Sequence, residues 1–190
     1  MSDFNIAYKE TGKIEGGLAN DKKDKGGFTY AGIASKFWPN WRGWSIIKEA
    51  WERHKHDIEA TDKELASNKE LWVLIKGFYQ ANFFNTLNIS GIKDQQIANA
   101  VYDFGVNSGT HTSGDKLQDA YNTLFPNNKL VNDGAIGNKS LAAINSVSPP
   151  LFLKQFNIER DKYYRSLSDF KTFGKSWLSR IKPYNINYHA

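Results

Sequence analysis

Hydrophobic residues recur at helical spacing near the start of the chain. The run that begins at Phe4 would place its apolar side chains on one face of a helix, which we predict from about residue 3 to residue 13. Ser2 precedes this run and is the expected N-cap, and Gly16-Gly17 marks its end. A carboxylate, Glu15, therefore stands at the C-terminal edge of the predicted helix.

The same spacing returns after Trp44 and continues to the end of the chain. One run begins at Trp44, a second lies between Leu71 and Tyr79, and each places its large apolar residues on one helical face. Further helices are predicted at about residues 94–107, 113–124, 138–146, 150–167 and 172–181.

The stretch between these helical patterns has a different character. The letters FTYAGIA, residues 28–34, are rich in β-forming residues and follow Lys25-Gly26-Gly27, which favours a turn. We predict a short hairpin or strand pair within residues 18–34 and no other sheet. The predicted fold class is mainly α, in the α+β sense, with a small β-hairpin near the N-terminus and a helical bundle lobe behind it.

Turn-forming residues between these elements form only short breaks. They gather around residues 88–91, 126–128, 132–134 and 148–150, and none of these breaks is long enough to act as a flexible tether. A chain of 190 residues with 40% hydrophobic content can bury one sizeable core. We therefore predict a single domain over residues 1–190.

Composition limits the chemistry that the chain can perform. It contains no cysteine, which excludes a disulfide framework and thiolate metal sites. His54 and His56 are two positions apart and would not share a helical face, and VNDGAIG, residues 131–137, lacks the ligand spacing of a calcium loop. The sequence has neither a nucleophile elbow nor a phosphate-binding loop. We expect no metal and no cofactor.

The positive charge of the chain is concentrated near its end. The net charge is +5, and residues 151–190 carry eight Lys and Arg against three Asp and Glu. Such a region suits an anionic partner, and it equally suits a solubilising surface. No recognisable nucleic-acid-binding module accompanies it, so we expect no nucleic acid partner, and we expect a monomer. The chain also lacks an apolar run of the roughly 18 residues that a membrane span needs, and lacks a Sec signal pattern.

Two carboxylates and a hydroxyl in the opening stretch are candidates for catalysis. Cleavage of a glycosidic bond needs a proton donor and a second group that stabilises the cation or activates water. Glu15, where the helix dipole opposes the ionised form, is the candidate donor, and Asp24, nine positions later, is the candidate ionised partner. Thr29 could hold a water. From spacing alone, solvated loop charges explain the same pattern, and Asp21 competes with Asp24.

Candidate substrate-binding residues lie further along the chain. Trp38 and Trp41, in FWPNWRGW, have aromatic faces that can stack on sugar rings, and core packing is the alternative. Tyr30 is a third aromatic candidate, although it alternates away from its neighbour on a strand. Asp103 and Asn107, one helical turn apart, could reach N-acetyl or hydroxyl groups, while helix capping explains Asn107 equally well.

The opening stretch resembles a known signature. Its residues Glu15-Gly16-Gly17, Asp24, Gly26-Gly27, Thr29 and Gly32-Ile33 resemble glycoside hydrolase family 108, lysozyme-like N-acetylmuramidases of bacteria and phages that are also labelled secretion activator proteins. They are also similar to the glutamate, aspartate and threonine triad of phage lysozymes. Leu18 departs from the pattern, since an aromatic commonly follows the glycine pair. The resemblance implies Glu15 as general acid, with Asp24 and Thr29 as its partners.

The resemblance continues into the second half of the chain. AVYDFGVNSG, KLQDAYNTL and VNDGAIGNKSLAAIN, within residues 95–181, look like the segment called a predicted peptidoglycan-binding domain in this family. Glycine- and asparagine-containing turns before a basic terminal helix also resemble the C-terminal lobe of a lysozyme. We therefore expect a catalytic segment at 1–88 and a peptidoglycan-binding segment at 89–185, packed as the second lobe of one lysozyme-like domain.

The family implies a peptidoglycan hydrolase that cleaves the β-1,4 bond between N-acetylmuramic acid and N-acetylglucosamine. The alternative is a non-catalytic protein that binds peptidoglycan or assists secretion on the same scaffold. Without a Sec signal, the expected route to the cell wall is release from the cytoplasm, as for a phage endolysin, or export by a non-Sec route.

Overall fold

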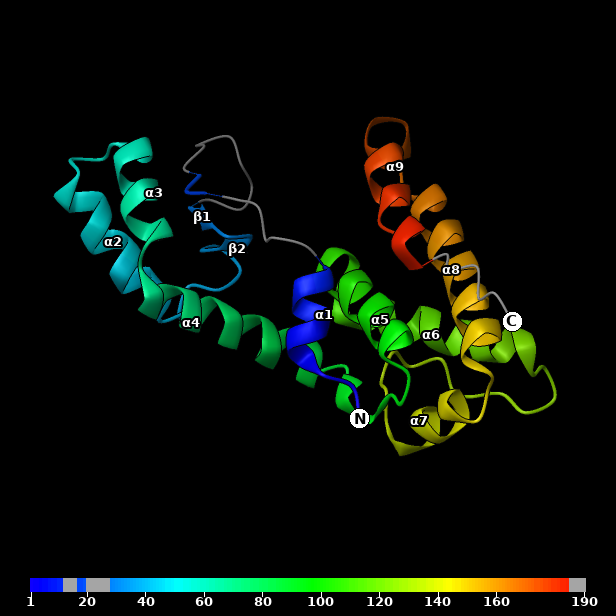
Figure 1. Ribbon diagram of the computed structural model, residues 1–190. Helices are drawn as coiled ribbons and strands as arrows, with labels where there is room; N and C mark the ends of the chain where they lie inside the picture. Colours follow the sequence, from blue (N-terminus) through cyan, green and yellow to red (C-terminus); the bar gives the residue numbers. More distant parts are fainter. Residues whose placement is uncertain (12–16, 20–27, 185–190) are drawn as a thin grey trace. The chain divides into compact units, whose positions relative to one another are not determined.

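The computed structural model describes residues 1–11, 17–19 and 28–184. Two compact units make up the chain: a hairpin unit, Gly12–Tyr79, and a helical unit, Met1–Thr11 together with Gln80–Ala190. The described residues are mostly helical and include one two-stranded antiparallel sheet (Figure 1). The predicted fold class, lysozyme-like and mainly α with a small hairpin near the N-terminus, is confirmed.

The hairpin unit combines two short strands with three helices. Its elements are β1 (Thr29–Tyr30), β2 (Ile33–Ala34), α2 (Gly43–Arg53), α3 (Ile58–Ala66) and α4 (Lys69–Tyr79).

A two-residue turn joins β1 to β2. Ala31 and Gly32 both have positive φ angles, 46° and 75°, as a tight hairpin turn requires. Only glycine adopts such angles without strain, which accounts for Gly32 in the sequence. The hydroxyl of Tyr79 donates a hydrogen bond of 2.9 Å to the carbonyl of Ala31, so α4 holds the turn in place. The turn predicted at Lys25-Gly26-Gly27 lies outside the described residues.

Helix α3 was not expected from the periodicity of the sequence. Its buried face consists of only Thr61 and Leu65, which is too narrow to give a clear apolar repeat. Its start is nevertheless well specified, because the Asp57 side chain accepts a hydrogen bond of 2.8 Å from the N–H of Ala60.

The helical unit contains the larger number of elements. They are α1 (Phe4–Glu10), a π-helical turn η1 (Gln80–Asn85), a 3₁₀ turn η2 (Ile89–Gly91), α5 (Gln95–Ser108), α6 (Thr110–Leu124), α7 (Asn138–Asn145), α8 (Pro149–Ser166), α9 (Phe170–Ser179) and a 3₁₀ turn η3 (Lys182–Tyr184). Each of the five helices predicted beyond residue 90 is confirmed, with ends that differ by up to three residues.

Helix α1 begins differently from the prediction. Asp3, not Ser2, is its N-cap, and the Asp3 carboxylate accepts hydrogen bonds from the N–H groups of Asn5 and Ile6. A carboxylate also favours the positive end of the helix dipole, which a hydroxyl does less well. Ser2 instead donates a hydrogen bond of 2.6 Å to the carbonyl of Ile92, which ties the chain start to the residues just before α5.

Helix α5 lies at the centre of the helical unit (Figure 1) and packs against α1, α6 and α8. Every residue from Ile97 to Gly105 is buried, so the helix has no solvent-facing side there, which is the pattern of a core helix. Gly109, with φ 89°, separates α5 from α6 and lets the chain re-enter a helix at once, so α6 begins at Thr110, before the predicted start.

Candidate active site

The proposed catalytic residues fall only partly within the described chain. Glu15 and Asp24 lie outside the described residues, and Thr29 lies inside them. The structure therefore gives the geometry of two neighbouring segments only. They are residues 17–19, which follow Glu15, and the hairpin that begins after residue 27.

Asp62 on α3 holds the chain directly after the first glycine pair. Its Oδ1 accepts a hydrogen bond of 3.1 Å from the backbone N–H of Leu18. A Cβ on Gly17 would come within 2.5 Å of Asp62 Oδ2, so any larger residue here would force the Asp62 carboxylate or the backbone to shift. Gly17 therefore has a structural reason to be glycine.

Thr29 is fixed through its backbone on both sides. It exchanges two hydrogen bonds of 2.9 Å with Ala19, and in the β1–β2 ladder it is paired with Ala34. Residue 19 thus continues the hairpin as a third extended segment beside β1. This arrangement joins the chain that follows Glu15 to the strand that carries Thr29.

Tyr30, the next residue on β1, is buried, with 2% of its surface exposed. Burial and the nearby charge of Asp62 raise the pKa of Tyr30 to about 12, so its phenol stays neutral at physiological pH. Its ring packs against Trp72 at a centroid distance of 6.5 Å. The substrate contact predicted for Tyr30 stays a prediction, and the position of the ring is that of a core residue.

The tryptophans after the hairpin form an aromatic cluster with α4. Trp38, 39% exposed, packs edge-to-face on Phe78 at 4.8 Å, and Trp41 contacts both Phe78 and Trp44. Trp44 is buried, and its indole N–H donates a hydrogen bond of 2.7 Å to the carbonyl of Trp38. Trp38 and Trp41 therefore each keep part of their surface exposed, and their predicted contact with sugar stays a prediction.

Asp103 lies in the helical unit at the centre of a buried ion cluster. Asp103 is 3% exposed, and its carboxylate binds two arginines, Arg160 and Arg180, with each ion pair at 2.9 Å. Burial raises the pKa of the Asp103 carboxyl, and the two guanidinium groups oppose that rise. Both carboxylate oxygens are thus engaged by arginines within the protein, and the substrate contact predicted for Asp103 stays a prediction.

Asn107 is exposed but turns back onto its own helix. Its side-chain amide donates a hydrogen bond of 2.7 Å to the carbonyl of Asp103, one turn earlier. This is the helix-end contact that the sequence left open as the alternative. The predicted substrate contact of Asn107 stays a prediction.

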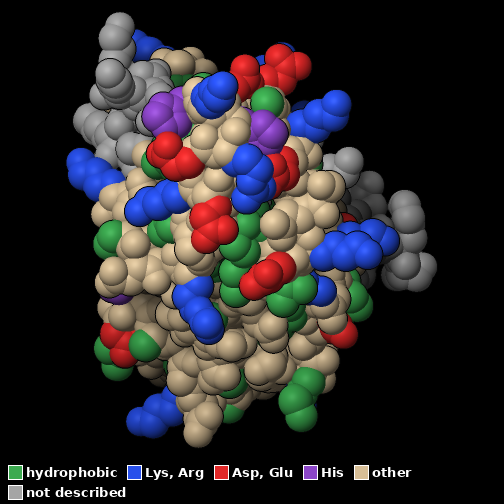
Figure 2. Space-filling view, turned by 90° about the vertical axis from the view of Figure 1, so that its left-hand side faces the viewer, with side chains coloured by type: hydrophobic (Ala, Val, Ile, Leu, Met, Phe, Trp, Pro, Cys, Tyr) green, Lys and Arg blue, Asp and Glu red, His purple; other side chains and the backbone are tan. Residues whose placement is uncertain are grey.

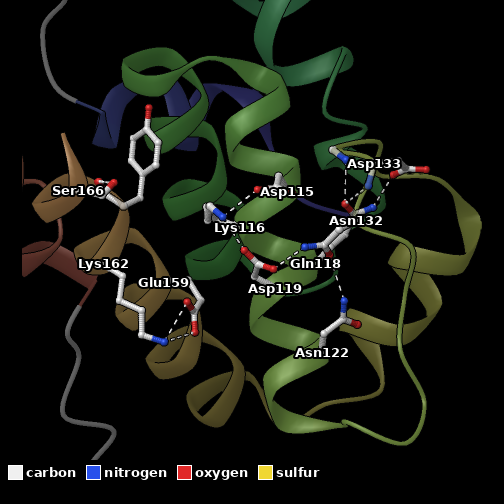
Figure 3. A network of polar contacts seen from close by, with 12 residues as sticks. Asp115, Lys116, Gln118, Asp119, Asn122, Asn132, Asp133, Glu159, Lys162 and Ser166 are labelled. Carbon is white, nitrogen blue, oxygen red and sulfur yellow. Dashed lines mark hydrogen bonds and ion pairs between the residues drawn. The ribbon is translucent and has the colours of Figure 1, made fainter. Parts of the chain in front are cut away.

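A polar network fixes the loop between α6 and α7 in the helical unit (Figure 3). The buried Gln118 accepts hydrogen bonds from the N–H groups of Asp133 and Gly134, and donates to the Asp133 carboxylate and the Ala135 carbonyl. The Asn122 side chain donates a hydrogen bond to the carbonyl of Leu130 and accepts one from the N–H of Leu130. This segment of the predicted peptidoglycan-binding region therefore has a defined conformation.

In the view from the side of α2 and α3, acidic and basic side chains intermix on the described surface (Figure 2). This view therefore shows no patch of a single charge sign. Among the described residues, no group of three or more His, Asp and Glu side chains is arranged to hold a metal ion. No helix in the described ranges is both long and apolar enough to cross a membrane.

The helices and the hairpin of the described residues define a lysozyme-like fold. The chain belongs to the glycosyl hydrolase 108 family, whose model matches residues 8–109. It is similar to a solved structure, Brucella abortus SagA, at 25% sequence identity and a TM-score of 0.66, over 96% of this chain and 91% of that chain. No curated protein matches it. The resemblance found in the opening stretch is confirmed.

Sequence reasoning missed Asp62 and Arg160. Asp62 contacts Leu18 across 44 positions, and Arg160 contacts Asp103 across 57. No local pattern signals a partner at such separation. For Arg160 the sequence offers one hint, an arginine at a position that continues the apolar face of its helix.

Proposed function

We propose that this protein is a lysozyme-type N-acetylmuramidase that hydrolyses the β-1,4 bond between N-acetylmuramic acid and N-acetylglucosamine in peptidoglycan. The observation that carries the proposal is the glycosyl hydrolase 108 match over residues 8–109. That stretch includes Glu15, Asp24 and Thr29 together, which are the residue types that glycosidic cleavage needs.

In this proposal each of the three residues has a separate role. Glu15 protonates the glycosidic oxygen as the leaving group departs. Asp24, ionised, stabilises the positive charge that develops on the sugar, and Thr29 positions the water. The pairing of Thr29 with Ala19 supports this assignment, because it links the hairpin to the residues that follow the acid.

Peptidoglycan is the proposed partner, and the protein would act on it as a monomer. The basic residues after position 150 favour contact with an anionic wall, an advantage that salt screens. We propose that the protein reaches the wall on release from the cytoplasm, as a phage endolysin does, or by a non-Sec route.

The test measures the release of reducing sugar from purified peptidoglycan alongside the fall in turbidity. Glu15→Gln should abolish turnover, since an amide cannot donate the proton, and Glu10→Gln, an exposed glutamate on α1, is the matched control. Both variants should show the wild-type circular dichroism spectrum. Full activity in a folded Glu15→Gln protein contradicts the assignment, and binding to insoluble wall without any sugar release by the wild type points to the non-catalytic alternative.

A further inference from the structure

A second candidate site lies in the hairpin unit, and its described lining includes none of the three residues assigned a role in catalysis, although Phe28 directly precedes Thr29. It is a pocket of about 630 Å³, within the range of small-ligand sites. Its lining is contributed by the hairpin, the loop after it and one face of α2: Phe28, Ser35, Pro39, Trp44, Lys48, Trp51 and Glu52.

Three aromatic rings form one apolar wall of this pocket. Phe28 packs edge-to-face on Trp51 at 5.5 Å and on Trp44 at 6.1 Å. The ring of His56 stacks on Trp51 at 5.1 Å with an interplanar angle of 16°, which supports that indole. The three rings are thus held by contacts with one another and by His56, which does not line the pocket, and they offer an apolar surface to a ligand.

Two opposite charges stand on the same face of α2 as the tryptophans. Lys48 follows Trp44 by one helical turn, and Glu52 follows Lys48 by one more. Lys48 forms no ion pair within the part of the chain that the structure describes. The Glu52 carboxylate is 73% exposed and has His56 Nε2 at 3.1 Å from each oxygen. Both charged residues line the pocket, and the structure shows no ion pair between them.

We propose that this pocket binds a short peptide that carries both a free carboxylate and a free ammonium group. Lys48 pairs with the carboxylate, Glu52 pairs with the ammonium, and the aromatic wall covers the aliphatic part between them. A neutral sugar suits the pocket less well, because it has no charged group to pair with Lys48 or Glu52.

The natural source of such a peptide rests on the proposed function. The peptide stems of peptidoglycan carry free carboxylates and amines, so a hydrolase that grips the stem would gain affinity for the wall outside its glycan-cleaving residues. The recognition chemistry of the pocket is independent of that source.

The test is titration of the full-length chain with the tripeptide L-Ala-γ-D-Glu-meso-diaminopimelate, followed by calorimetry and by tryptophan fluorescence. We expect saturable binding, and we expect Lys48→Gln and Glu52→Gln each to raise Kd by about threefold to tenfold. Lys63→Gln and Glu59→Gln, exposed charges on α3, are the matched controls and should leave Kd unchanged. All four positions are exposed or lie on a helix surface, so the variants should keep the wild-type fold.

Other outcomes overturn the proposal. Absence of tripeptide binding does so, as does binding that Lys48→Gln and Glu52→Gln leave unchanged. Binding of chitotetraose that depends on Lys48 or Glu52, without tripeptide binding, would make the pocket a sugar site. The Glu15→Gln protein should bind the tripeptide like the wild type, so failure of the hydrolase assignment appears in sugar release alone and failure of the pocket assignment in the titration alone.

Discussion

The carboxylate of Asp62 accepts a hydrogen bond from the backbone N–H of Leu18, across 44 positions of sequence. Leu18 is three residues beyond Glu15, the proposed general acid, and 6% exposed. Asp62 therefore ties helix α3 to the chain that follows the acid. If Glu15 is the general acid, as proposed, Asp62 would be a positioning residue for it, although Asp62 lies far from Glu15 in sequence.

Replacing Asp62 should loosen this attachment. Asp62→Ala leaves the buried Leu18 N–H without its acceptor, so we expect the free energy of unfolding to fall by about 1–3 kcal/mol. Urea denaturation followed by circular dichroism measures the change, with Glu59→Ala on the same helix as control. Wall hydrolysis at a temperature where the variant is folded should also slow, because the segment after Glu15 is less constrained. A variant as stable as the control would remove Asp62 from this role.

Gly17→Ala should be destabilising for a reason that a double-mutant cycle can isolate. The added methyl group would lie 2.5 Å from Asp62 Oδ2, so one of the two must move. In an Asp62→Ala background the obstacle is gone, and the same substitution should cost much less. Urea denaturation of the four proteins gives the coupling. If the two substitutions are additive, the cost of an alanine at position 17 arises elsewhere.

The Asp103 cluster should be a major source of stability in the helical unit. Arg160 has no exposed side-chain surface, so Asp103→Ala leaves its charge buried and without a carboxylate, which we expect to cost about 3–5 kcal/mol. Arg180→Gln should cost less, since 37% of that side chain is exposed. Chemical denaturation measures both changes.

The same variants separate a structural role from substrate contact. With Asp103 enclosed by two arginines, we expect the folded Arg180→Gln protein to hydrolyse peptidoglycan with an unchanged KM. A raised KM together with an unchanged unfolding free energy would instead support the substrate contact predicted from the sequence for Asp103.

Local sequence patterns predicted most of the helices and strands, but few of the long-range contacts between them. Helical spacing located α5 to α9, and the β-forming letters of residues 28–34 located the hairpin, because both are signals within a few residues. Helix α3 was not predicted, since only two of its residues are buried and they give no clear apolar repeat. Asp3 took the N-cap role from Ser2 because the hydroxyl of Ser2 binds Ile92, a partner 90 positions away.

The candidate site shows the same difference between local sequence signals and long-range contacts. The Glu15 to Thr29 signature is local and was found, whereas the partner of Leu18 depends on how the chain folds back. Charge is a further case: the basic excess near the end of the chain is partly internal, since Arg160 and Arg180 bind Asp103. A count of charges cannot separate a buried ion pair from a surface patch.

Gln118 should determine the order of the loop before α7. It is 1% exposed and makes four hydrogen bonds to residues 133–135 (Figure 3). Gln118→Leu keeps much of the volume and removes every one of these bonds, so the amides of Asp133 and Gly134 should exchange with solvent much faster. Hydrogen exchange read by NMR tests this, with Gln80→Leu at an exposed position as control. Unchanged protection would mean that the loop is held by its other contacts.

Glu64 should make the stability of the hairpin unit depend on pH in the acid range. The hydrogen bond from His54, at 2.7 Å, together with the ion pair to Arg53, holds the pKa of the Glu64 carboxyl below its ordinary value. The unfolded chain then takes up this proton first, so the stabilisation is complete above about pH 4.3 and is lost as the pH falls through the folded value. Urea denaturation should show Glu64→Gln less stable than wild type near pH 6, with the gap closing towards pH 3. Glu59→Gln should show no such convergence, and a Glu64→Gln gap that stays constant down to pH 3 would contradict the prediction.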